Sequence, residues 1–326
     1  MRDAPQDIAA RSAYFSDDVE TARGRFLSAC DRIGLRVTSY PARVPAAGEG
    51  AGGALYCDVA RLGAPEAENL LVLCPAAAGG AGFAGAGVVH GVLAGGLSRD
   101  LPRDVACLLV HAINPIGPSW PPHDATIAQA APGEETPAVP WSDGMLSAAD
   151  RRFAAYEKAQ RFDRDRLAGQ TLASLAPPAW DRAVTQAIAT THLGNRRRIL
   201  FVDVRTGAGP FGEIDYLAPN QPGTGARETA ERWLGQPLEG SSASLGQSTA
   251  PIAGGLAALA PTQACEKASV LLEAGTYSMA TLLQASGPRG SDGIAAYPRE
   301  ARWRAQLWDA ASEVIRRGFK GLADGA

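Results

Sequence analysis

Apolar runs bounded by glycine, proline and charged residues divide the chain into short strands and longer helices. Three runs are almost continuously apolar, which is typical of strands covered on both faces. These runs are Asn69–Cys74, Val105–Ala112 and Ile199–Val204. Further strands are predicted at Arg36–Tyr40, Ala54–Arg61 and Lys267–Glu273, and the alternation in the second favours a place near an edge.

Segments with helical periodicity separate these strands. The predicted helices are Ser16–Ile33, Gly85–Leu97, Ser147–Phe162, Trp180–Leu193, Ala226–Leu234, Tyr277–Ala285 and Arg302–Phe319. Strands that alternate with helices along the chain favour an α/β fold. We see no repeat and no convincing linker, so residues 1–326 are expected to form a single domain.

The charge composition argues against two classes of partner, and it does not identify a particular partner. The net charge is −3 and acidic and basic residues are mixed, so neither nucleic acid nor an anionic membrane surface is an expected partner. No apolar run reaches the length of a membrane span, and the first residues lack the apolar core of a signal peptide. The expected location is therefore the cytoplasm.

Cysteine and histidine spacing shows no local metal motif. The five cysteines contain no C-x-x-C pair, and several lie in apolar runs, as buried thiols do. None of the four histidines has the H-x-x-E or H-E-x-x-H spacing of a zinc site.

The segment after Ile199–Val204 carries a candidate site. The strand leads into a loop rich in glycine and proline, and Asp203 and Arg205 lie where it emerges. Ligands of open α/β sheets gather at the carboxyl ends of strands. The sequence therefore places a cation, Arg205, where a binding site is expected.

Five stretches together resemble one known family. They are Tyr14–Asp17, Cys74–Gly85, Val110–Gly117, Asp203–Gly212 and Leu272–Thr276. Their order and spacing are similar to those of a bacterial carboxypeptidase-like family of unknown function, related to zinc carboxypeptidases, succinylglutamate desuccinylase and aspartoacylase. The resemblance covers nearly the whole chain. It implies a three-layer α/β/α sandwich with a mixed central sheet.

The chain departs from this family at the residues that would hold zinc. The family carries T-H-G-x-E-G after its first central strand, whereas Ala78 and Ala81 occupy the positions of its His and Glu ligands. It carries D-x-H-T-G at the later strand, where this chain has Arg205 in place of the third ligand. The family's substrate-gripping Asn-Arg pair is missing from 121–130. Glu273 matches the family's catalytic general base.

These replacements argue against zinc hydrolysis. A catalytic zinc ion needs three protein ligands and an open water position. Alanine offers no ligand atom, and a guanidinium repels a cation. We therefore expect a metal-free, degenerate relative, a pseudoenzyme without a cofactor, in which Glu273 is at most a vestigial general base.

Two hypotheses concern Arg205 itself. In the first, Arg205 pairs with Glu273 and replaces the metal's charge, the alternative being that both side chains reach solvent. In the second, Arg205 receives a small anion, with Thr206 and the 207–212 backbone as further donors and His123 as another candidate ligand-binding residue. The expected partner is a small anionic molecule or a protein, such as a paralogous active enzyme.

Three alternatives stay open at this stage. One is an active hydrolase or amidase with a non-standard site around Glu273 and Arg205, or with a metal on His111 and His123. Another is nucleotide binding by the G-x-G-x-x-G of Gly80–Gly85, with Asp100 and Asp104 beyond it. The third is a Cys74 nucleophile with a histidine partner, against which its apolar surroundings favour an inert buried thiol.

Overall fold

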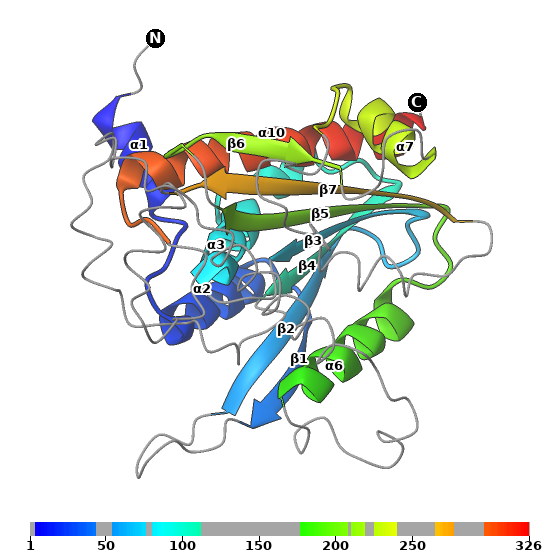
Figure 1. Ribbon diagram of the computed structural model, residues 1–326. Helices are drawn as coiled ribbons and strands as arrows, with labels where there is room; N and C mark the ends of the chain where they lie inside the picture. Colours follow the sequence, from blue (N-terminus) through cyan, green and yellow to red (C-terminus); the bar gives the residue numbers. More distant parts are fainter. Residues whose placement is uncertain are drawn as a thin grey trace, which may run out of the picture.

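The computed structural model describes residues 4–43, 54–75, 80–111, 177–207, 210–218, 225–239, 265–276 and 297–325. These residues form an α/β fold on one seven-stranded sheet with the order β1-β2-β4-β3-β5-β7-β6 (Figure 1). The strands are β1 Val37–Arg43, β2 Ala54–Leu62, β3 Asn69–Pro75, β4 Val105–His111, β5 Arg198–Gly207, β6 Ile214–Leu217 and β7 Glu266–Gly275. The predicted α/β class is confirmed.

The sheet is mixed, as expected, because a parallel centre carries antiparallel strands at both sides. The four central strands β4, β3, β5 and β7 run parallel. β2 and β1 extend one side antiparallel, and β6 closes the other side antiparallel to β7. Every residue of β3 and β4 is buried, which explains their unbroken apolar sequences.

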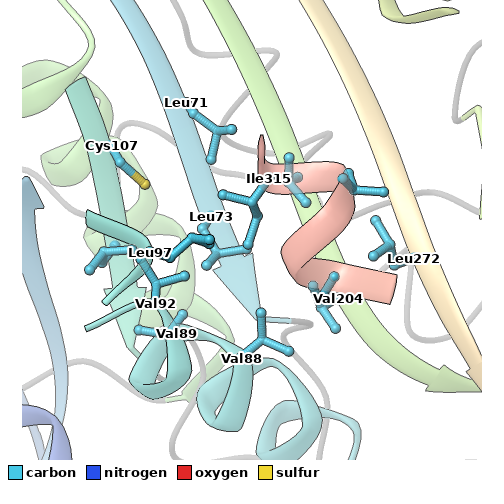
Figure 2. Close-up of a cluster of buried hydrophobic side chains, with 14 of the residues drawn as sticks. Leu71, Leu73, Val88, Val89, Val92, Leu97, Cys107, Val204, Leu272 and Ile315 are labelled. Atoms are coloured by element: carbon cyan, nitrogen blue, oxygen red, sulfur yellow. The ribbon is translucent and has the colours of Figure 1, made fainter. Parts of the chain in front are cut away.

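Helices cover both faces of the sheet and make the three layers. On one face lie α2 Val19–Arg32, α3 Gly80–Ala94 and α10 Ala301–Asp324, and on the other lies α6 Pro177–His192 (Figure 1). The remaining described helices are α1 Pro5–Ser12, α7 Gly225–Leu234 and a 3-10 turn at Leu97–Asp100. In Figure 2, Val88 and Val92 of α3 gather with Ile315 of α10 over Leu73 and Val204 of the sheet.

Glycines let α3 approach its neighbours closely. A Cβ atom at Gly85 would lie 2.4 Å from Cβ of Pro75, and one at Gly91 would lie 2.3 Å from Cζ3 of Trp308. The helix begins at Gly80, so the predicted start at Gly85 is wrong and much of the glycine-rich stretch is helical. Packing against the sheet and α10 overrides the low helix propensity of glycine.

The other differences between the predicted and the observed helices and strands concern short elements and one helix cap. α1 and β6 were not predicted, and α2 is capped by Asp18, whose Oδ1 accepts from the Thr21 amide at 2.7 Å, instead of by Ser16. The predicted helices Ser147–Phe162 and Tyr277–Ala285 lie outside the described residues. Among the helices that are described, none combines the length and apolar character needed to cross a membrane.

Two glycine substitutions in helices should have opposite effects on stability. Gly91→Ala drives a methyl group into Trp308 and should lower the free energy of unfolding by about 1–3 kcal/mol. At Gly24 of α2 an added Cβ meets nothing within 4 Å, so Gly24→Ala should raise it by about 0.5–1 kcal/mol. Urea denaturation of both variants measures this, and equal shifts would contradict the described packing of α3.

Candidate functional site

Arg205 of β5 and Glu273 of β7 are neighbours on adjacent parallel strands. Their Cα atoms are in register, so both side chains project from the same face of the sheet. Nε of Arg205 donates to Oε2 of Glu273 at 2.7 Å, and Nη2 lies 2.6 Å from the same oxygen. The two side chains are 20% and 9% exposed. The pairing predicted from the sequence is thus confirmed, and the ion pair is largely removed from water.

Gly207 provides the space that the carboxylate occupies. A Cβ atom there would lie 2.4 Å from Cδ and 2.5 Å from Oε1 of Glu273. The glycine also pairs with Gly275 at the ends of the two strands. The ion pair therefore depends on a residue two positions beyond the arginine. The sequence pattern gave no reason to single out this glycine from its neighbours.

The ion pair lies at the carboxyl ends of the central strands. β3 ends at Pro75, which is in register with Val204, and the next residue of β5 is Arg205. The beginning of α3 is close by, since a Cβ atom at Gly85 would lie 3.0 Å from the carbonyl oxygen of Val204. β5 continues through Gly207, so Arg205 lies within the strand and not in the loop that was expected after Val204. Pairing with β7 holds it there.

Carboxylates flank the ion pair on the same face. Asp215 of β6 is in register with Glu273 and is half-buried. Ile214 and Tyr216, its neighbours in the strand, pack on the opposite face. Asp203 is a buried residue two positions before Arg205, and so on the face of the ion pair. Among the described residues near the ion pair, three acidic side chains thus lie on the face of Arg205.

Thr206 does not join this group. Strand alternation directs its side chain to the opposite face, where Leu200, Val202 and Val204 belong to the core under α3 and α10. Thr206 is buried, and its hydroxyl has no hydrogen-bond partner among the described residues. A ligand held by the Arg205 side chain would therefore not contact the Thr206 hydroxyl, contrary to the expectation that the two act together.

The ends of β5 and β7 are fixed by residues that sequence reasoning did not single out. Oγ1 of Thr276 donates to the carbonyl oxygen of Gly207 at 2.8 Å, and the indole Nε1 of Trp303 donates to that of Gly275 at 2.8 Å. Trp303 lies in the first turn of α10, so this helix fixes the end of β7, while Thr276 links the end of β7 to the end of β5. An aromatic residue in an amphipathic helix indicates core packing, and its hydrogen bond becomes visible only in the fold.

Three of the proposed site residues cannot be placed fully. Ala78 and His123 lie outside the described residues. Ala81 falls in the first turn of α3, near the carboxyl end of β3. The structure therefore brings together Arg205 and Glu273. It also puts the beginning of the helix that carries Ala81 near the carboxyl ends of the same central strands.

Cys74 and His111 point to opposite faces of the sheet. Cys74 packs with Val72 on the α6 face, and burial and the charge of Asp203 raise the pKa of its thiol. His111 stacks on Phe26 of α2 with ring centroids 4.9 Å apart, and burial lowers its pKa to about 4. The two cannot form a cysteine–histidine pair, and His111 also faces away from Arg205.

Gly85, the last glycine of Gly80–Gly85, is placed for packing. Gly85 is pressed against Pro75, and the segment forms the first turns of a helix in place of an open loop. The two acidic residues beyond it have other partners. Asp100 forms a salt bridge with Arg316 at 3.0 Å, and Asp104 accepts from Asn69 at 3.0 Å. These contacts disfavour the nucleotide-binding alternative.

The residues at the site do not fit a zinc ion. Arg205 brings a positive charge to the position of one ligand, and its guanidinium donates to the carboxylate that would otherwise serve as general base. Alanine in the sequence at positions 78 and 81 supplies no ligand atom. Within the described ranges, no three His, Cys, Asp or Glu side chains lie close enough to share a metal ion. We derive no reaction step through zinc.

Fold and site together define an α/β protein with a mixed seven-stranded sheet and an arginine–glutamate pair at the carboxyl ends of its central strands. The chain belongs to a family described as a protein of unknown function, DUF2817, whose model matches residues 15–123 and 176–310. The recognition of a family of unknown function from the sequence is thereby confirmed. No curated protein matches the chain.

Solved structures resemble the chain at low sequence identity. A metallo-carboxypeptidase from Burkholderia cenocepacia is 13% identical, with 93% of this chain and 68% of that chain covered and a TM-score of 0.44. A glutaminyl cyclase from Porphyromonas gingivalis is 12% identical, with 98% and 96% covered and a TM-score of 0.45. A putative succinylglutamate desuccinylase/aspartoacylase from Shewanella frigidimarina is 16% identical, with 80% and 73% covered and a TM-score of 0.36. We take nothing about activity from them.

Removing one partner of the ion pair should destabilise the protein more than removing both. Arg205→Met leaves Glu273 with a largely buried charge, and we expect a loss of about 2–3 kcal/mol in the free energy of unfolding. Adding Glu273→Met should recover most of this loss, because no unpaired charge then stays buried. Urea denaturation of the two single variants and the double variant measures the coupling. Additive losses would show that the pair does not form in solution.

A methyl group at position 207 should disturb the pair without removing a charge. Gly207→Ala forces the Glu273 carboxylate to move and should lower the free energy of unfolding by about 1–3 kcal/mol. Gly194→Ala is the matched control, since its Cβ atom would meet nothing within 4 Å, and a change within about 0.5 kcal/mol is expected. If Gly207→Ala were as mild as its control, the described position of Glu273 would be wrong.

Proposed function

We propose that this protein is a degenerate, metal-free member of the carboxypeptidase-like class that binds a small carboxylate without hydrolysing a substrate. The observation that carries the proposal is the Arg205–Glu273 ion pair at the strand ends. A fixed guanidinium supplies positive charge where the resemblance implies a zinc ligand. The ligand would be a small organic acid or an exposed carboxylate of a protein partner.

The geometry of the pair leaves one side of the guanidinium for a ligand. Nε and Nη2 both address Oε2 of Glu273. A guanidinium has five N–H donors in a planar fork, so the edge that carries Nη1 is directed away from this contact. A carboxylate matches the spacing of two donors on such an edge. Glu273 would then orient the arginine and would not itself contact the ligand.

The same geometry argues against Glu273 as a general base. Its Oε2 already accepts from two nitrogens of Arg205, so proton transfer to that oxygen would require the pair to open. Without a ligand set for zinc, no group in the described site acidifies a water molecule. The hydrolase alternative around Glu273 and Arg205 therefore lacks both a free general base at Oε2 and a group that acidifies water.

Charge at the site favours a singly charged ligand. Glu273 neutralises Arg205, and Asp215 adds a negative charge on the same face. A dianion such as phosphate would meet repulsion from these carboxylates, whereas a monocarboxylate brings the smallest negative charge that the arginine fork can hold. This reasoning selects carboxylates from the wider class of small anions.

Calorimetric titration of the purified full chain with acetate, propionate and phosphate tests the proposal. We expect saturable, millimolar binding of the monocarboxylates, and no phosphate binding that depends on Arg205. Arg205→Gln should weaken carboxylate binding at least about tenfold, because a charge-assisted contact is lost. Arg198→Gln, at the other end of β5, is the matched control and should change it less than about twofold. Equal effects of the two variants would overturn the assignment to Arg205.

Metal analysis of the same preparation separates the proposal from a zinc enzyme. We expect zinc well below one equivalent, and no shift in thermal stability when zinc is added. Stoichiometric zinc that survives dialysis, together with hydrolysis of an acylated amino acid that Glu273→Gln abolishes, would replace the proposal by an active hydrolase.

A further inference from the structure

A second candidate binding site lies on the helices that cover one face of the sheet. It is formed by residues that are remote in sequence from Arg205 and Glu273. A groove of about 560 Å³ runs between α2, α3 and the segment that joins α1 to α2. It is lined by Tyr14 from that segment, by Gly24, Arg25, Ser28 and Arg32 of α2, and by His90 of α3. None of the described side chains that line it is acidic. The charge of the groove's lining is therefore opposite to the charge of the face around Arg205, which is rich in carboxylates.

One of the two cations of the groove, Arg25, is held in place by the fold. Nη1 of Arg25 donates to the carbonyl oxygens of Ala13 at 3.0 Å and Phe15 at 2.9 Å, which fixes the guanidinium against one wall. Arg32 lies in the last turn of α2, two turns further along the same side of the helix. A preorganised guanidinium loses little side-chain freedom when it binds an anion.

The side chain of His90 lies within the electrostatic influence of both Arg25 and Arg32. Its Nδ1 lies 3.0 Å from the carbonyl oxygen of Tyr14. A carbonyl oxygen only accepts, so Nδ1 donates and Nε2 is left for other contacts. Burial lowers the pKa of His90, and the charges of Arg25 and Arg32 lower it further. An anion beside this ring would therefore be attracted by both guanidinium groups.

Gly24 is the observation that separates this groove from an ordinary charged surface. It lies in the interior of α2, where glycine weakens a helix relative to alanine. At Gly85 and Gly91 a neighbouring residue requires glycine, but at Gly24 an added Cβ atom meets nothing within 4 Å. No contact with a described residue explains the glycine, and Gly24 lines the groove. A ligand that lies against the helix would account for it.

We propose that this groove binds the phosphate group of a small phosphorylated molecule. Two guanidinium groups without an acid in the described lining suit a dianion, and Ser28 of the lining carries a hydroxyl group that can act as a neutral donor. The volume falls in the range of small-molecule sites, so the groove has room for more than the phosphate. This site is independent of the carboxylate site at Arg205.

Titration of the full-length protein with inorganic phosphate at low, constant ionic strength tests the proposal. Binding is followed by the backbone amide resonances of α2 and the ring resonances of His90. We expect saturable shifts at these positions. Arg32→Gln should weaken binding at least about fivefold, since one of two charge-assisted contacts is lost. Arg36→Gln is the matched control, an exposed arginine outside the groove, and should change binding less than about twofold.

Gly24→Leu tests the groove by shape and not by charge. Leucine is a better helix former than glycine, so the variant should fold with a raised thermal midpoint while its side chain fills the floor. We expect phosphate binding to be lost in this variant and unchanged in Arg205→Gln. The proposal is overturned if phosphate does not saturate, if Gly24→Leu binds like the wild type, or if Arg32→Gln and Arg36→Gln weaken binding equally. It is also overturned if only Arg205→Gln abolishes binding.

Discussion

The site depends on a salt bridge that two parallel strands hold in register. Arg205 and Glu273 meet because β5 and β7 align them on one face, and because Gly207 leaves room for the carboxylate. Either charge left alone at this degree of burial would destabilise the protein, whereas together Nε and Nη2 of Arg205 neutralise Oε2 of Glu273. The hydrogen bonds from Thr276 and Trp303 to the strand ends keep this alignment. The guanidinium of Arg205 thereby provides a fixed positive charge at the carboxyl ends of the central strands.

Glycine has three different roles in this fold, and neighbouring atoms decide which one applies. Gly85 and Gly91 bring α3 close to the sheet and to α10, and Gly207 makes space for a charged side chain. Gly24 has no neighbour that needs it. Gly85 also belongs to Gly80–Gly85, the stretch that matches a phosphate-binding pattern. The contacts show that close helix packing explains this stretch without a nucleotide.

Two surfaces of the molecule differ in the charge that they can accept. In the described part of the chain, Glu273, Asp203 and Asp215 lie on the face of Arg205, so the charge of Arg205 is already balanced. The groove between α2 and α3 gathers two arginines and His90 without an acidic side chain in its described lining. Electrostatics therefore separate a site suited to a monocarboxylate from one suited to a phosphate group.

The sequence by itself determined the α/β class and the central strands, and it offered the pairing of Arg205 with Glu273 as one hypothesis that the structure then decided. Asn69–Cys74 and Val105–Ala112 were predicted to within one residue of β3 and β4, because strands buried on both faces need unbroken apolar runs. Only the tertiary structure decided which way Thr206 points, where β5 ends and what lies beside Glu273. The reason is that strand order and register place Asp215 and Gly207 next to Glu273, although both are more than fifty positions away in the chain.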